Sequence, residues 1–191
     1  MKKTIFIVLG VIGLLAVMLF SSFIGAYNSL QTLDESVNSS WSQVENQLQR
    51  RGDLIPNLVN TVKGYAKYES SIFISVAESR AKLSGAVKSG NMKQITKADG
   101  EMSGALSRLL AISENYPQLK ADTIFINLQD ELAGTENRLA VARRDFNDNV
   151  QILNSKIRIF PTNIIAGMIG IQKREYFQAD EAKKAAPNVQ F

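Results

Sequence analysis

Two polar stretches carry the side chains of this chain that are best suited to chemistry. The first covers residues 41–57 and the second covers residues 131–145. Carboxylates and guanidinium groups at such positions can pair with one another, bind a partner's charges or transfer protons. They therefore predict a polar layer that fixes helix register, a surface for another protein, or a paired-carboxylate site for acid–base work. The candidates are Gln43, Glu45, Arg50, Arg51, Asp53, Glu131, Glu136, Arg143 and Arg144.

Arg51 falls where the local pattern expects an apolar residue. A buried charge without a partner costs several kcal/mol, so Arg51 needs a carboxylate, and Glu131 or Glu136 could supply it. We favour the structural polar layer, because carboxylate catalysis needs a cleft and regular packing of helices does not predict one. A deep polar pocket lined by Glu45, Arg50, Glu136 and Arg143 would instead indicate ligand binding or catalysis.

The composition removes the commonest catalytic sites. The chain has no Cys and no His, which excludes the usual zinc sites and the serine or cysteine triads that need His. We expect no metal and no cofactor. The net charge is +4, and Lys2 and Lys3 account for half of this excess. Because the remaining basic residues are spread without interleaved aromatic residues, no nucleic-acid partner is expected.

Apolar residues recur every three or four positions, which predicts amphipathic helices. One helix starts at residue 27 and follows an apolar seam to Leu48. Trp41 lies on this seam and is therefore predicted to be a core anchor. At residues 52–56, Gly52 suits a helix end, Asp53 a helix start and Pro56 a first turn. The chain either reverses there or bends as one long helix, and we favour a reversal.

Further helices are predicted over residues 54–88, 92–115 and 122–160, with turns at residues 89–91 and 116–117. No strand-type alternation is present. The fold class is therefore all-α: an N-terminal transmembrane helix followed by an antiparallel up-and-down four-helix bundle over residues 27–160. Residues 161–191 form a tail, interpreted either as a cap on the bundle or as a second contact with the membrane or a partner.

The N-terminus predicts a membrane anchor. After a short segment, residues 1–4, the stretch 5–26 carries no charge and is long enough to span a hydrocarbon core of about 30 Å. A cleaved signal peptide is the alternative, but the apolar stretch is long and Ile24 occupies a cleavage-site position that needs a small residue. Lys2 and Lys3 predict a cytoplasmic N-terminus, with the remaining chain on the outer side of the inner membrane.

Long, ordered motifs resemble those of the LemA family. They include Arg50-Arg51-Gly52-Asp53-Leu54-Ile55-Pro56 and Ala142-Arg143-Arg144-Asp145-Phe146-Asn147. The resemblance implies a bacterial, membrane-anchored four-helix bundle without an agreed biochemical activity. Where the family pattern has a His, this chain has Tyr68. The matching segments are residues 27–30, 41–45, 49–59, 61–65, 114–121, 134–138, 142–147, 160–163, 166–167, 176–177 and 187–191.

These observations predict a non-enzymatic, membrane-tethered scaffold of the bacterial envelope. Its expected partners are the membrane and another envelope or membrane protein, with self-association possible. The alternatives are a ligand-binding or enzymatic cleft between helices, and a protein that remodels the membrane or assembles within it.

Overall fold

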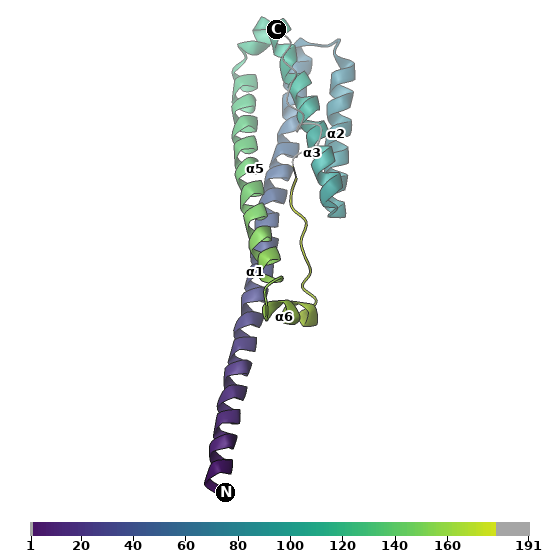
Figure 1. Cartoon of the computed structure of the whole chain (residues 1–191). Helices are drawn as coiled ribbons and strands as arrows, with labels where there is room; N and C mark the ends of the chain where they lie inside the picture. The colour runs from purple at the N-terminus through teal and green to yellow at the C-terminus, as the bar shows by residue number, and fades with distance from the viewer. Residues whose placement is uncertain (1, 179–191) are drawn as a thin grey trace, which may run out of the picture. The chain divides into compact units, whose positions relative to one another are not determined.

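Helices make up all the regular structure of residues 2–178, the part of the chain that the structure describes (Figure 1). This computed structural model confirms the predicted all-α class. The predictions for residue 1 and for residues 179–191 lie outside the described part. The helices are α1 (Lys2–Tyr65), α2 (Ser70–Ser89), α3 (Met92–Ala111), the 3-10 helix η1 (Ile112–Asn115), α4 (Pro117–Lys120), α5 (Thr123–Lys156) and α6 (Thr162–Ile169).

The described residues divide into two compact units. The first, called the anchor unit here, contains residues 2–39 and 148–174. The second, called the bundle unit, contains residues 40–147 and 175–178. Both α1 and α5 contribute residues to both units. The predicted domain boundaries, with an anchor at 5–26 and a bundle at 27–160, stay predictions.

The bundle unit is an antiparallel four-helix bundle. It is built from the last part of α1, from α2 and α3, and from the first part of α5, and successive segments run in opposite directions (Figure 1). The predicted seams face inward. The core includes Val44, Leu48, Leu58, Val62, Val76, Leu83, Ile95, Met102, Leu109, Phe125, Leu139 and Phe146, all buried. Trp41 is half-buried and packs on Phe146, with ring centroids 5.3 Å apart.

The predicted reversal at residues 52–56 is wrong. Helix α1 continues through Pro56 and ends at Tyr65, so the chain turns at residues 66–69 instead. Proline has no N–H, so the carbonyl of Gly52 cannot accept the usual bond from four residues ahead. Arg80 of α2 takes this place, because its Nε donates to the Gly52 carbonyl at 2.7 Å. A tertiary contact thus compensates for the local signals that predicted a break.

Replacing Arg80 by Ala is expected to destabilise the bundle unit by about 1 kcal/mol, because Gly52 loses its side-chain donor. The measurement is urea unfolding followed by the fluorescence of Trp41, the only tryptophan. In a Pro56→Ala background the helix regains its own N–H donor, so the cost of Arg80→Ala should shrink. Arg108→Ala is the matched control, since exposed Arg108 donates to the side chain of Ser75 and thus not to a carbonyl that a proline leaves free. An equal cost in both backgrounds contradicts the argument.

The other turns follow the sequence closely. Gly90 ends α2 with φ of 66°, a left-handed conformation that glycine adopts without steric cost. Asn91 caps α3 by accepting a hydrogen bond from the N–H of Gln94 at 3.1 Å. Asp122 caps α5 through the N–H groups of Ile124 and Phe125, at 2.8 and 3.0 Å. The predicted turns at residues 89–91 and 116–117 are confirmed.

The anchor unit holds the long apolar part of α1. Among the described helices, α1 alone is long and apolar enough to cross a membrane. The large apolar side chains that the structure describes from Phe6 to Tyr27 are exposed, whereas Leu30 is fully buried. Helix α5 ends at Lys156, four residues before the predicted end, and the tail then forms α6. The buried core of this unit consists of Leu30, Val37, Val150, Leu153, Ile165 and Ala166.

Candidate functional site

Arg51 is the centre of a buried polar cluster in the bundle unit. Its side chain is only 4% exposed, and Nη1 lies 2.8 Å from Oδ1 of Asp99. Its Nη2 donates to the hydroxyl of Ser103 at 2.9 Å. Because Asp99 and Ser103 are four residues apart on α3, both project from the same helix face. The burial of the Arg51 charge is therefore compensated chiefly by α3, a helix in which the sequence analysis named no candidate site residue.

Arg143 brings α5 to the same carboxylate. Its Nη2 lies 2.8 Å from Oδ2 of Asp99, so each oxygen of Asp99 faces one arginine. Glu136, also on α5, places Oε2 3.3 Å from Nη1 of Arg51. Residues Arg51, Asp99, Ser103, Glu136 and Arg143 are called the arginine–carboxylate layer below. The layer joins α1, α3 and α5, and its two positive and two negative charges balance.

Not every polar atom of the layer has a protein partner. The Nε atoms of Arg51 and Arg143 are buried and lack a hydrogen-bond partner among the described residues, as do Gln47 Oε1 and Thr96 Oγ1. Removing one member of a buried ion pair is costly, because a charge remains behind without compensation. The layer is therefore a strong constraint on how α1, α3 and α5 can pack.

The segment after α6 is attached to Asn147 and Arg143 within the bundle unit. The side-chain amide of Asn147 accepts from the Phe177 N–H at 2.8 Å and donates to the Phe177 carbonyl at 2.9 Å. The guanidinium of Arg143 lies 4.7 Å from the centroid of the Phe177 ring, within the range of a cation–π contact. Phe177 is 7% exposed and so covers one side of Arg143.

A second group of charges lies at the surface. Arg50 donates from Nε to Glu131 at 3.0 Å and also bonds it through Nη2. Arg138 reaches the same carboxylate at 3.1 Å. The hydrogen bond from Arg50 and its positive charge, with Arg138 adding less, lower the pKa of Glu131 below its ordinary value. Such exposed pairs contribute little to stability because water and salt screen them.

Tyr65 and Asp122 connect the end of α1 to the start of α5. The Tyr65 hydroxyl donates to Oδ2 of Asp122 at 2.6 Å. This hydrogen bond is the main reason why the pKa of Asp122 is lowered and the pKa of Tyr65 is raised. Asp122 thus stabilises the folded state fully at pH values above its ordinary pKa of 3.8. This stabilisation is lost as the pH falls through the lowered pKa of the folded state.

For Tyr65 the contribution to stability depends on pH in the opposite direction. Its contribution is complete below the ordinary pKa of 10.0 and is lost as the pH rises through the raised value. Tyr65→Phe should therefore lower the stability by a constant amount between pH 3.8 and 10.0, and by less outside these limits. Urea unfolding of both proteins over this pH range checks the prediction. Tyr116→Phe serves as a control, and parallel pH profiles for the native protein and Tyr65→Phe throughout would contradict it.

A groove of about 950 Å³ lies between α1 and α2 in the bundle unit. Its lining mixes apolar with charged side chains, among them Glu45, Asp53, Arg80 and Lys88. Of the four residues that a predicted catalytic pocket required, only Glu45 lines it, whereas Arg143 and Glu136 belong to the arginine–carboxylate layer. No three carboxylates within residues 2–178 are grouped so as to hold a metal ion.

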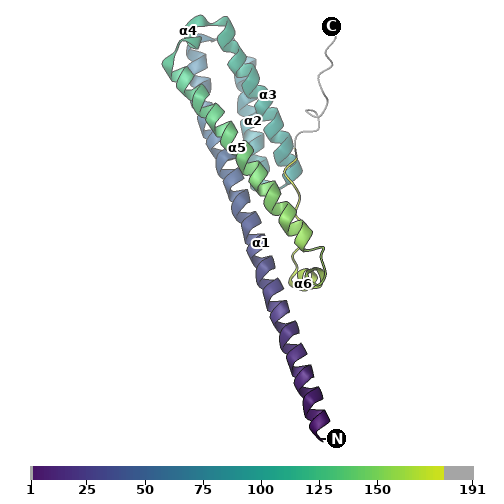
Figure 2. The same cartoon turned by 60° about the vertical axis from the view of Figure 1, so that its left-hand side comes forward.

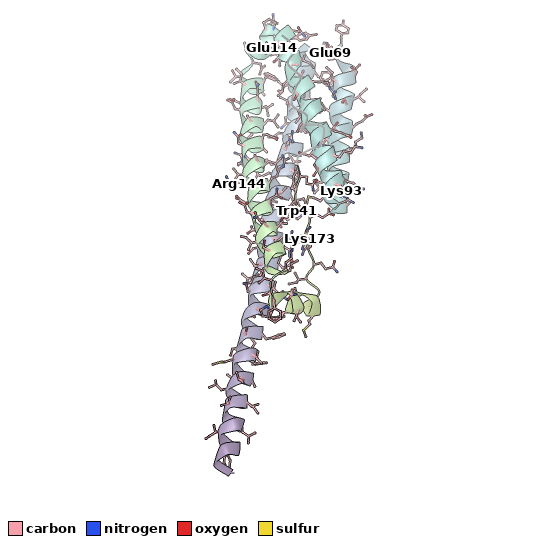
Figure 3. The ribbon with its side chains drawn as sticks, viewed as in Figure 1. Trp41, Glu69, Lys93, Glu114, Arg144 and Lys173 are labelled. Carbon is pink, nitrogen blue, oxygen red and sulfur yellow. The ribbon has the colours of Figure 1, made fainter. Side chains whose placement is uncertain are left out.

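The structure thus separates the predicted candidates. Arg51, Glu136 and Arg143 come together, and Arg50 meets Glu131 nearby. Gln43 is exposed, and Arg144 lies on the outer side of α5 beside Asp145 (Figure 3). Asp99 was missed, although it lies four residues after Ile95 and three before Met102, on the apolar seam of its helix. A lone carboxylate on a seam was the available signal.

Comparison with known proteins identifies relatives of this chain. The chain is 29% identical over 196 residues to magnetosome protein MamQ 2 of Paramagnetospirillum magneticum, which covers 90% of this chain and 72% of the relative. It is 28% identical to magnetosome protein MamQ of Magnetospirillum gryphiswaldense, over 82% of this chain and 66% of that protein. Protein LemA of Metamycoplasma hominis is 24% identical, over 85% of this chain and 73% of that protein. The sequence pattern of the LemA family matches residues 40–191, and the chain belongs to this family.

Proposed function

We propose that this protein is a non-enzymatic scaffold, tethered to a bacterial membrane by α1, which binds another membrane or envelope protein through its bundle unit. The observation that carries the proposal is the arginine–carboxylate layer. Its charged groups bind one another across three helices, so three of the predicted candidates, Arg51, Glu136 and Arg143, are engaged in holding the bundle together.

The groove between α1 and α2 is the surface that we assign to the partner. Its mixed charges and exposed apolar atoms resemble the composition of non-obligate interfaces. The test introduces a photo-crosslinking amino acid at Gln49, an exposed groove residue, in the full chain in intact cells. We expect one prominent adduct with a membrane protein. The same amino acid at Arg144, outside the groove, should give none. Equal labelling from both positions would contradict the assigned surface.

The tether predicts a defined orientation, with the N-terminus in the cytoplasm and the bundle unit outside. The chain has no native Cys, so one introduced thiol reports its own position. Lys93→Cys, at an exposed position at the start of α3 (Figure 3), should react with a membrane-impermeant maleimide in intact spheroplasts. Lys2→Cys should react only after lysis. The reverse labelling pattern would contradict the predicted orientation. Release of the Lys93→Cys protein into the medium would contradict the membrane tether.

The groove also supports a second candidate function, the binding of a small polar ligand. Glu45 and Asp53 offer carboxylates while Arg80 and Lys88 offer cations, so a zwitterionic ligand would match the lining. A ligand screen by thermal unfolding, repeated with Glu45→Gln, distinguishes this candidate from protein binding. Ligand-dependent stabilisation that the variant loses would favour it, whereas turnover of the ligand would establish an enzyme.

A further inference from the structure

Four large apolar side chains lie exposed in the anchor unit around α6. Ile159 is 57% exposed, Phe160 76%, Ile164 55% and Met168 71%. Ile164 and Met168 are four residues apart on α6, which places them on one face of the helix, and Phe160 lies in the turn that precedes it. The opposite face of α6 is buried through Thr162, Ile165 and Ala166. Helix α6 therefore presents an apolar stripe that the described chain does not cover.

The charged residues that flank α6 in the sequence are basic. Residues 149–174 contain no Asp or Glu, but they contain Lys156, Arg158, Lys173 and Arg174. Arg174 is paired with Asp34 at 2.8 Å, whereas Arg158 and Lys173 are exposed at either side of α6. Apolar side chains flanked by basic ones are typical of helices that lie in the headgroup region of a membrane with anionic lipids.

The position of α6 also favours a membrane surface as the partner of the stripe. In both views α6 lies beside α1, close to the level at which the exposed apolar part of α1 ends (Figures 1 and 2). Burial along α1 supports this level, since Tyr27 is 39% exposed and Leu30 is fully buried. A bilayer crossed by the exposed part of α1 would have its surface at this height. Helix α6, which carries the stripe, would then lie beside that surface.

We propose that α6 is an interfacial anchor, which inserts Phe160, Ile164 and Met168 into the surface of the same bilayer that α1 crosses, with Arg158 and Lys173 on anionic headgroups. The proposal rests on the membrane tether proposed above. Two contacts with one bilayer would fix the tilt and the rotation of the anchor unit. A span alone leaves both to thermal motion.

The test uses nitroxide labels on single cysteines in the full chain, reconstituted into vesicles of phosphatidylcholine and phosphatidylglycerol. Spin relaxation by oxygen, which partitions into lipid, is compared with relaxation by a water-soluble nickel chelate. Met168→Cys and Phe160→Cys should give an oxygen-to-nickel ratio several-fold higher than Ser155→Cys, an exposed position on α5. Leu14→Cys, in the exposed apolar part of α1, reports insertion of the span in the same preparation.

The outcomes are separable. Lipid exposure at Leu14 with water exposure at Met168 overturns the interfacial anchor and leaves the tether intact. Water exposure at both positions overturns the tether as well. Protection of Met168 from both reagents, relieved by dilution with unlabelled protein, means that a second copy covers the stripe, and this also overturns the proposal. Lipid exposure at both positions, with water exposure at Ser155, supports it.

Discussion

Replacement of Asp99 by Ala is expected to destabilise the bundle unit by about 3–5 kcal/mol, because two arginines then lose the carboxylate that they share. Arg51 has no route to solvent, since its side chain is 4% exposed. Arg143 is 21% exposed and can relax part of the way. A domain is stable by about 5–15 kcal/mol, so this single change removes a large share of its stability.

Urea unfolding of the full chain in detergent micelles measures the effect. Trp41 is a suitable probe, because its ring packs on Phe146 within the same unit. Asp130→Ala is the matched control, since Asp130 is an exposed carboxylate on α5. The control should change the stability by about 0.5 kcal/mol or less. Equal unfolding midpoints for the two variants would show that the layer carries no such energy.

A double variant separates stability from specificity. Asp99→Leu combined with Arg51→Met replaces the buried pair by apolar side chains, which is often neutral or even stabilising. We expect the double variant to recover part of the stability that Asp99→Leu alone loses, because the fully buried Arg51 charge is gone. Arg143 still lacks Asp99, but its side chain is 21% exposed and can turn toward solvent. If the two substitutions add without coupling, Arg51 and Asp99 do not act as one unit. Recovery would mean that the layer selects one arrangement of helices at a cost in stability.

The regular parts of this fold could be predicted because they depend on local periodicity. Seams at intervals of three and four residues located α3 and α5 to within a few residues, and Asp122 and Asn91 marked helix starts. The first turn could not be located in the same way. Gly52, Asp53 and Pro56 are all turn signals, but Arg80 satisfies the carbonyl that Pro56 leaves free. The real turn, at residues 66–69, contains neither Gly nor Pro.

The site was predictable only in part, for a related reason. The position of Arg51 on an apolar seam predicted a carboxylate partner, and Glu136 does lie close to it. The shared partner, Asp99, is 48 residues away in sequence, and only the packing of α3 brings it within reach. Asn147 and Asn154 are ordinary helix residues until the chain after α6 returns to them. Contacts between distant segments depend on tertiary packing, which local patterns in a single sequence do not predict.

Asn154 leads to the second large effect. Within the anchor unit its side chain is 5% exposed and holds the backbone of Arg174 by two hydrogen bonds. The Arg174 N–H donates to Oδ1 at 2.9 Å, and Nδ2 donates to the Arg174 carbonyl at 2.9 Å. Asn154→Ala removes both bonds at once. The expected loss is about 1–3 kcal/mol, enough to raise the population of the locally opened state roughly 5- to 150-fold.

Trypsin reports this opening directly, because it cleaves after Lys173 and Arg174 in a segment without helical structure. We expect faster cleavage at these bonds in Asn154→Ala, while cleavage elsewhere in the described helices stays unchanged. Ser155→Ala, at the exposed neighbouring position, is the control and should be cleaved at the native rate. Asn147→Ala is the counterpart in the bundle unit, where it should free Phe177 from its two bonds. Unchanged cleavage in Asn154→Ala would mean that the ion pair of Arg174 with Asp34 is sufficient to hold this segment.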